Sequence, residues 1–298
     1  MTMAKVWVPP IKIQGIKTKL VPFIQQSISS TADSIWVEPF MGSGVVGFNL
    51  APKQAIFADT NPHIISFYNH IQTGKITAPL VRSYLELEGY HLSQQGDPYY
   101  YEVRKRFNEL HNPLDFLFLN RSCFNGMIRF NRNLEFNVPF GHKPQRFAKA
   151  YITKIVNQVA HIEALLKTHD WQFLCQDFAQ TITQAPKNAF IYCDPPYIGR
   201  HVDYYDSWTE EQECTLKRVL TQSKHPFMVS TWDHNQYRRN DCLQTIWQGC
   251  HKVTQEHFYH VGAKEINRNP MVEALLMNYT PTSSLPSSPV PEQMTLFQ

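Results

Sequence analysis

Short apolar runs alternate along this chain with longer segments in which apolar residues recur at helical spacing. The pattern predicts buried strands at 34–38, 55–58, 171–175, 189–193 and 227–231. It predicts helices at 20–27, 45–50, 151–167 and 210–220. Asn61 is placed to cap a further helix that contains Ile64, Ile65 and Tyr68. Strands that alternate with helices are typical of an α/β fold with a mainly parallel sheet.

The alternation stops between residues 75 and 150, and we interpret this stretch as an inserted second domain. It contains an apolar, helix-like run at 114–119, followed by a turn-rich polar and aromatic segment at 120–146. The insert divides the α/β domain into residues 1–74 and 151–280. The predicted architecture is therefore one α/β domain with a mainly helical insert.

The C-terminal part contains two late strand signals, at 254–261 and 271–279. They enclose a loop at 262–270, so we expect a long-looped hairpin that closes the sheet. Residues 281–298 are rich in Pro and Ser and are predicted to be disordered.

Charge is distributed unevenly over the 298 residues. The net charge of +3 is too small to indicate a polyanionic partner, but residues 101–150 alone contain nine Lys or Arg against four Asp or Glu. Binding to nucleic acid requires a local excess of this kind, although a solvated basic face also produces one.

Six cysteines are scattered without a CxxC pair or a Cys/His cluster at metal spacing. We expect free thiols in a reducing compartment and no metal site. The sequence shows no signal peptide and no apolar run of about 20 residues, the length of a membrane span. We therefore expect a soluble cytoplasmic protein that does not enter a membrane.

A glycine turn, Gly42-Ser43-Gly44, separates the first predicted strand from the helix at 45–50. Glycines at this place allow backbone to approach a ligand closely at a helix N-terminus. A purely structural turn and a nicotinamide dinucleotide site are the alternatives. Glu38, at the preceding strand end, argues against a pyrophosphate because it would repel one.

Acidic residues follow three of the predicted strands. Glu38 suits a cationic ligand, and Asp59 can accept two ribose hydroxyls. S-adenosylmethionine combines both features, since it joins an adenosine to a sulfonium amino acid. Asp177 and Phe178 are candidates to hold the adenine amino group and ring, or Asp177 is a helix N-cap.

The apolar run at 189–193 ends at Asp194-Pro195-Pro196-Tyr197, the DPPY segment. The Asp194 carboxylate and the Pro195 carbonyl can accept both hydrogens of an exocyclic amine, and Tyr197 offers a stacking face. Two acceptors expose the lone pair of a conjugated amine, so methylation needs only positioning and electrostatics. A base in a duplex reaches such a site only if it is flipped out. The basic insert would hold phosphates, with Arg129 as a guanine reader or a phosphate clamp.

Together these motifs resemble those of the Dam-type DNA adenine-N6 methyltransferases of the D12 class. Their order, with cofactor motifs, insert and then DPPY, is that of group α, and the resemblance spans residues 5–280. It implies a Rossmann-like, S-adenosylmethionine-dependent methyltransferase sheet with a helical DNA-recognition insert. It assigns catalysis to Asp194, Pro195, Pro196 and Tyr197.

The resemblance also assigns binding residues. Cofactor contacts are expected from Ile13, Gln14, Gly15, Lys17, Glu38, Pro39, Phe40, Gly42, Gly44, Asp59, Asp177, Phe178 and Asp194. DNA contacts are expected from Lys12, Arg121, Asn125, Met127, Arg129, Asn131, Asn137, Lys143, Arg200 and Arg268, with Met127 as a wedge in the duplex. Many relatives have Trp-x-Gly-Gly-Lys where this chain has Ile13-Gln14-Gly15-Ile16-Lys17, and His142-Lys143 also depart from the pattern.

The sequence thus predicts an adenine-specific DNA methyltransferase that acts on a GAT-containing duplex site, GATATC or GATC, in restriction-modification or an epigenetic role. We expect a nucleoid-associated prokaryotic monomer, with any cognate restriction endonuclease sharing the site without binding the protein. Methylation of RNA or of a protein glutamine is an alternative. Another is a catalytically silent DNA-binding protein, which would have no chemical need for an intact acid and glycine turn.

Overall fold

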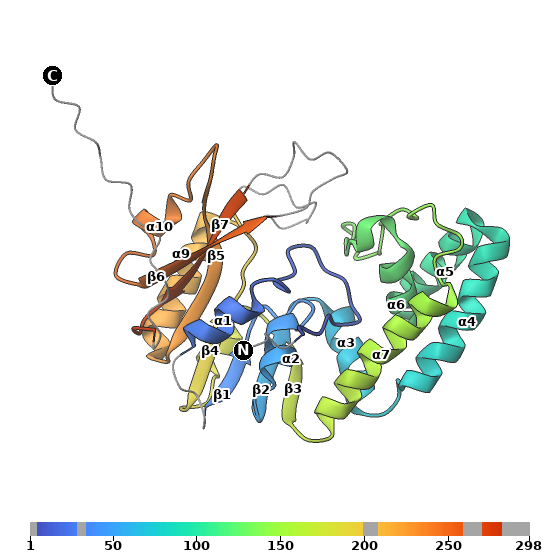
Figure 1. Cartoon of the computed structure of the whole chain (residues 1–298), viewed down its shortest axis with the longest axis horizontal. Helices are drawn as coiled ribbons and strands as arrows, with labels where there is room; N and C mark the ends of the chain where they lie inside the picture. Colours follow the sequence, from blue (N-terminus) through green and yellow to red (C-terminus); the bar gives the residue numbers. More distant parts are fainter. Residues whose placement is uncertain (1–4, 29–33, 199–207, 259–269, 282–298) are drawn as a thin grey trace.

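A computed structural model describes residues 5–28, 34–198, 208–258 and 270–281 (Figure 1). In these residues one sheet of seven strands has the order β3-β2-β1-β4-β5-β7-β6. Five strands are parallel to one another: β1 (Ile35–Glu38), β2 (Gln54–Asp59), β3 (Asp170–Cys175), β4 (Ala189–Cys193) and β5 (Phe227–Asn235). The mixed α/β fold and the position of β4 inside the sheet confirm the sequence prediction.

An antiparallel hairpin completes the sheet beyond β5. Strand β7 (Pro270–Met277) pairs with both β5 and β6 (His251–Phe258), as the late strand signals predicted. Strand β5 extends to Asn235, beyond the predicted strand, because β7 pairs with it as far as Met271 across a bulge.

Helices near the N-terminal half follow local signals. α1 (Val21–Ser27) and α2 (Val45–Leu50) lie where helices were predicted, and Asn61 caps α3 (Pro62–Gln72) by accepting from the backbone of His63 and Ile64. On the C-terminal side lie α8 (Phe178–Thr183), α9 (Glu210–Ser223) and the short α10 (Cys242–Thr245).

The region interpreted as an insert is mainly helical. It contains α4 (Ala78–Gln95), α5 (Asp97–Leu110), α6 (Pro113–Ser122) and a single 3-10 turn, η1 (Phe124–Gly126), before α7 (Lys149–Leu166) begins. These helices stand together beyond the β3 side of the sheet (Figure 1). No sequence signal was assigned to α4 or α5, and the division at 75 and 150 stays a prediction.

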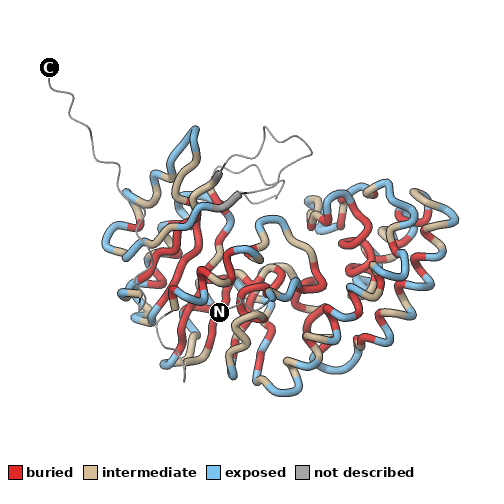
Figure 2. The backbone as a smooth tube through the Cα atoms, viewed as in Figure 1, coloured by how far each residue is buried: buried red, intermediate tan, exposed pale blue. Residues whose placement is uncertain are grey.

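Side chains of the central strands alternate between two hydrophobic clusters. On β4, Phe190 and Tyr192 join one cluster, whereas Ile191 and Cys193 join the other on the opposite face. The first cluster continues into the helices of the insert, where it includes Leu85, Phe107 and Phe118. Buried residues lie both in the strands of the sheet and on the inward sides of these helices (Figure 2).

Some of the residues for which the sequence predicted a role or a conformation are not among those described. Arg200, Arg268 and the tail from residue 282 onward lie outside the described residues. Among the described helices, none is long and apolar enough to cross a membrane.

Candidate active site at the carboxyl edge of the sheet

Three acidic residues follow parallel strands and therefore meet at one edge of the sheet. Glu38 ends β1, Asp59 ends β2, and Asp194 follows β4, which pairs with β1 through Val37 and Ile191. Carboxyl ends of parallel strands are the usual ligand-binding edge of α/β sheets.

The glycine turn is held by Asp59. Its two carboxylate oxygens accept from the backbone nitrogens of Gly42 and Asn61, both at 2.8 Å. Gly42 and Gly44 have φ values of 51° and 75°, a left-handed backbone that favours glycine. Burial raises the pKa of Asp59, and the two hydrogen bonds oppose this shift.

Glu38 is buried beneath the same turn. One of its oxygens accepts from the Trp36 indole at 2.9 Å and from the backbone nitrogen of Gly47 at 3.1 Å. A Cβ on Gly47 would lie 2.7 Å from this oxygen and 2.2 Å from the Phe57 ring, so only glycine fits there. Burial raises the pKa of Glu38 to about 8, and the negative charge of Asp194 adds to this shift.

Aromatic rings line the edge beside the turn. Phe40 stacks on Phe178 with centroids 5.3 Å apart, and Trp208 packs edge-on against Phe40 at 5.5 Å. Sequence reasoning missed Trp208 because a single tryptophan before a helix does not show which distant side chains it packs against. Asp177 caps α8 by accepting from the backbone of Ala179 at 2.8 Å, so the N-cap alternative is confirmed.

Lys17 connects the N-terminal loop to the DPPY segment. Its ammonium donates to the Gly15 carbonyl at 3.2 Å, lies 3.0 Å from an oxygen of Asp194 and sits 4.7 Å from the centroid of the Tyr197 ring. The side chain is 4% exposed. Burial raises the pKa of Asp194, and Lys17 counteracts this by favouring the ionised form.

Tyr197 is fixed from its other end by a residue that sequence reasoning missed. Its hydroxyl donates to Glu273 at 2.6 Å, and Glu273 lies buried on β7. Pro195 is buried and Pro196 exposed, so the segment turns outward between two anchored residues.

The remaining predicted cofactor residues occupy the loop and the strand end. Ile13 packs against the core, and its Cδ1 would lie 3.2 Å from a Cβ on Gly42. Gln14 and Gly15 are exposed in a turn, and Pro39 is buried directly after β1. The N-terminal loop, despite lacking the tryptophan and second glycine, thus brings Lys17 to the DPPY segment.

A second group of predicted residues lies around α6. The side-chain amide of Asn120 donates to the Lys12 carbonyl at 2.9 Å and accepts from the Lys12 nitrogen at 2.8 Å, which ties the N-terminal loop to α6. Arg121 is buried and donates to Gln158 and to the Tyr151 hydroxyl. Arg146 also donates to Tyr151, at 2.9 Å. Burial raises the pKa of Tyr151, but Arg121, Lys12 and Arg146 outweigh it and lower the pKa overall.

The 123–141 loop contains most of the other predicted DNA contacts. Arg129 donates through Nε to the Asn137 side chain at 2.8 Å and through Nη2 to the Asn137 carbonyl at 3.3 Å. Asn131 uses its side-chain oxygen to accept from the backbone of Asn133 and Glu135, so it holds a turn.

Met127, the residue predicted to act as a wedge in the duplex, is less exposed than its neighbour Phe124. Met127 packs against the hydrophobic core, whereas the neighbouring Phe124 is 50% exposed. Asn125, with a φ of 53°, is exposed beside Phe124, and Lys143 is exposed after the loop. Phe124 was missed because the sequence does not show which apolar side chains of this turn-rich segment stay exposed.

Comparison with known proteins gives a consistent result. Residues 14–265 match the family described as D12 class N6 adenine-specific DNA methyltransferase. The chain is 27% identical over 282 residues to the Type II methyltransferase M.FokI of Planomicrobium okeanokoites, covering 91% of the chain and 43% of that protein. It is 34% identical over 197 residues to the DNA adenine methylase of Haemophilus influenzae, covering 63% of each. With the DNA adenine methylase of Salmonella typhimurium it shares 35% over 210 residues, 66% of the chain and 71% of that protein.

Proposed function

The chain belongs to the D12 class N6 adenine-specific DNA methyltransferase family, and from this premise we propose that it methylates N6 of a flipped-out adenine in a GAT-containing duplex site. The methyl donor is S-adenosylmethionine, and the site is GATATC or GATC. The matched regions span 43% of M.FokI and 63% of the Haemophilus influenzae enzyme. We propose a monomer that serves restriction-modification or an epigenetic role.

The observation that supports this most is the placement of Asp194. Its carboxylate stands at the end of an inner strand, 3.0 Å from the buried ammonium of Lys17. An ion pair favours the ionised carboxylate, which is a hydrogen-bond acceptor only. Asp194 and the Pro195 carbonyl would accept the two hydrogens of the adenine amine and expose its lone pair.

The residues at the edge fit S-adenosylmethionine in chemical character. The acidic side chain of Glu38 suits its cationic amino acid, because a bound positive charge would favour the ionised form of Glu38. Asp59 suits its ribose, and the ring faces of Phe40 and Phe178 suit its adenine. When bound, this group supplies an electrophilic methyl on a sulfonium. The chain's own residues then have to place the amine in line with that methyl and keep water away.

Extrusion of the target base requires something to replace its stacking. Unstacking costs a few kcal/mol, and an inserted apolar side chain compensates part of this. Phe124 is the better wedge in this fold because its ring is 50% exposed, while Met127 packs against the core. Tyr197 would stack on the flipped adenine while its hydroxyl stays bound to Glu273.

The proposal is tested by methyl transfer from labelled S-adenosylmethionine to duplexes that contain GATATC, GATC or a scrambled site. Transfer to GATATC alone identifies the longer site, and transfer to both identifies GATC-type recognition. Asp194→Ala should abolish transfer while equilibrium binding of S-adenosylmethionine persists. Cofactor binding without transfer to any duplex would overturn the proposal in favour of RNA or protein substrates.

A further inference from the structure

One face of α5 holds the backbone of the 123–141 loop. Asn108 accepts from the Phe136 nitrogen at 2.8 Å and donates to the Phe136 carbonyl at 3.2 Å. The Tyr100 hydroxyl donates to the Val138 carbonyl at 2.8 Å, and Arg104 donates to the same oxygen at 3.5 Å. Tyr100, Arg104 and Asn108 are four residues apart, so they form one line along the helix.

The residue between these tied positions is Asn137. Phe136 and Val138 are buried, and successive side chains of an extended segment point to opposite sides, so Asn137 faces away from that buried side. There it accepts from the Arg129 guanidinium through its side chain and its carbonyl. The Asn137 nitrogen donates back to the Arg129 carbonyl at 3.1 Å. Asn137 therefore helps to position the guanidinium, and α5 positions Asn137 by bonding the residues on either side of it.

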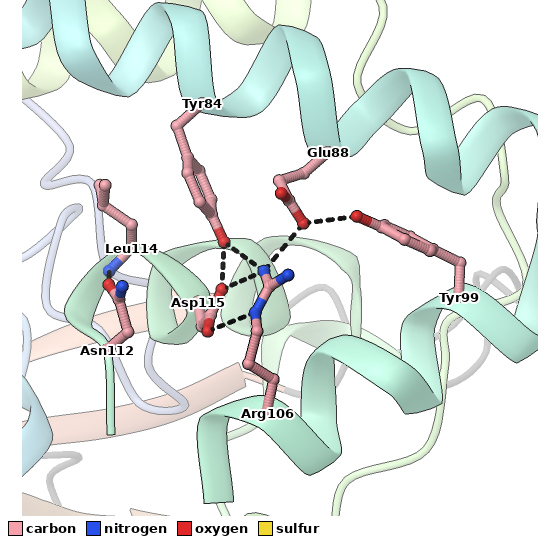
Figure 3. Close-up of polar contacts among 7 residues, drawn as sticks. All are labelled: Tyr84, Glu88, Tyr99, Arg106, Asn112, Leu114 and Asp115. Atoms are coloured by element: carbon pink, nitrogen blue, oxygen red, sulfur yellow. Dashed lines mark hydrogen bonds and ion pairs between the residues drawn. The ribbon is translucent and has the colours of Figure 1, made fainter. Parts of the chain in front are cut away.

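Helix α5 is itself anchored through a different face. Arg106 bonds Glu88 of α4 at 2.9 Å and Asp115 of α6 through Nε at 2.9 Å (Figure 3). Tyr84 donates to Asp115, and Tyr99 donates to Glu88 at 2.8 Å, so both carboxylates have further partners. Arg106 is two residues from both Arg104 and Asn108 and so points away from the loop-holding face. One side of α5 is thus bonded to α4 and α6, and another side is bonded to the 123–141 loop.

We propose that Asn108 is a positioning residue for base recognition, which acts through Asn137 on Arg129. This inference rests on the proposed function and, of the two roles that the sequence leaves open for Arg129, takes that of a guanine reader rather than a phosphate clamp. Discrimination by a bidentate side chain depends on placement within a fraction of an ångström, and such placement needs support from behind the contacting residue. Asn108 supplies this support because it bonds both polar groups of one backbone residue, in the manner of a strand partner.

The test compares Asn108→Ala with Gln94→Ala, which deletes a carboxamide from the exposed face of α4, where it contacts Ser93. Methyl transfer is measured on the duplex that the wild type methylates best and on duplexes changed at one base pair at a time. For Asn108→Ala, the preference at the base pair read by Arg129 should fall by about five- to hundredfold. Preferences at the other pairs, and all those of Gln94→Ala, should stay at wild-type values.

A merely structural role gives a different result. It would reduce transfer to all duplexes by the same factor, leave every preference unchanged and thereby overturn the inference. If Asn108→Ala does not fold, Tyr100→Phe serves instead, because it removes only a hydroxyl from the same face of α5. This variant should also lower the preference at the base pair read by Arg129, and an unchanged preference would contradict the inference. A wild-type protein that methylates no duplex would instead refute the proposed function on which this inference rests.

Discussion

The ammonium of Lys17 lies 3.0 Å from the carboxylate of Asp194 and 4.7 Å from the centroid of Tyr197. A single buried cation thus touches the first and last residues of the DPPY segment. Lys17 is therefore both an electrostatic partner of the acid that would orient the amine and a support for the ring that would stack on the base.

Replacement of Lys17 by Met should move the acid limb of the pH–rate profile upward. Burial then raises the pKa of Asp194 without the opposing effect of the Lys17 cation, so the carboxylate takes up its proton at a higher pH. The turnover rate should be measured from pH 5 to 9 with saturating S-adenosylmethionine. Lys53→Met, at an exposed lysine, is the control, and an unmoved acid limb in Lys17→Met would contradict the assignment.

Tyr197→Phe should destabilise the protein more than it slows turnover. It removes a donor to the buried Glu273, which costs about 1–3 kcal/mol, while the ring that would stack on the base remains. Urea unfolding should show this loss. Tyr90→Phe, at a tyrosine that is 61% exposed, should change stability little. Equal stabilities of the two variants would show that the Tyr197–Glu273 bond contributes nothing measurable.

Glu38→Gln should alter how stability depends on pH. The pKa of Glu38 is about 8 in the folded protein against an ordinary 4.5. Between these values the folded protein holds a proton that the unfolded chain has released, so the free energy of unfolding falls as pH rises. Glutamine cannot titrate but keeps an acceptor for Trp36 and Gly47. The melting temperature of the variant, relative to that of the wild type, should therefore increase from pH 5 to 8. A difference in melting temperature that stays constant over this range would exclude the effect.

Arg106→Met should destabilise the helical insert. It leaves Asp115 and Glu88, with side chains 1% and 8% exposed, without their shared cation. Breaking a buried pair costs about 3–5 kcal/mol, and we expect the lower value because Arg106 is itself 35% exposed. The neighbouring Lys105–Glu109 pair is exposed, so Lys105→Ala should cost under about 0.5 kcal/mol in the same denaturation measurement. Equal losses of unfolding free energy in the two variants would show that the cluster in Figure 3 stabilises the protein no more than an exposed ion pair does.

Arg129→Ala should relax sequence choice more than it weakens binding. A bidentate contact to guanine contributes about 1–3 kcal/mol of discrimination at one base pair. Transfer rates and affinities should be compared on duplexes that differ at single positions and at two salt concentrations. A uniform loss on all duplexes, with a smaller salt dependence, would identify Arg129 as a phosphate contact.

Local signals in the sequence identified the parts of the site that short segments build alone. The cap at Asn61, the left-handed Gly42 and Gly44, and the strand before Asp194 are recognisable from adjacent residues, although Asp59 also holds the glycine turn and β4 pairs with β1 and β5. The same locality explains an ambiguity at Asp177, because a carboxylate after a strand can cap a helix or bind a ligand with the same atoms.

Partners from distant segments were not predictable in this way. Glu273 is 76 residues from Tyr197, and their contact arises only because the antiparallel hairpin adds β7 beside β5. The helices α4 and α5 went unassigned because their buried aliphatic positions, such as Leu85 and Val103, are interspersed with the buried residues Glu88, Gly89, Tyr99 and Tyr100. The exposure of Phe124 depends on how the 123–141 loop folds back, not on its own neighbours in sequence.

One hydrophobic cluster joins the insert helices to the sheet and so fixes the distance between the two. Arg129 directly follows Ile128, and Asp194 lies two residues after Tyr192, and both Ile128 and Tyr192 belong to this cluster. With Arg129 as the reader of a base, packing therefore sets the interval between the base that is read and the base that is methylated. Substitutions in the 123–141 loop can then change which base is preferred. A site with a different interval would require the core itself to be rebuilt.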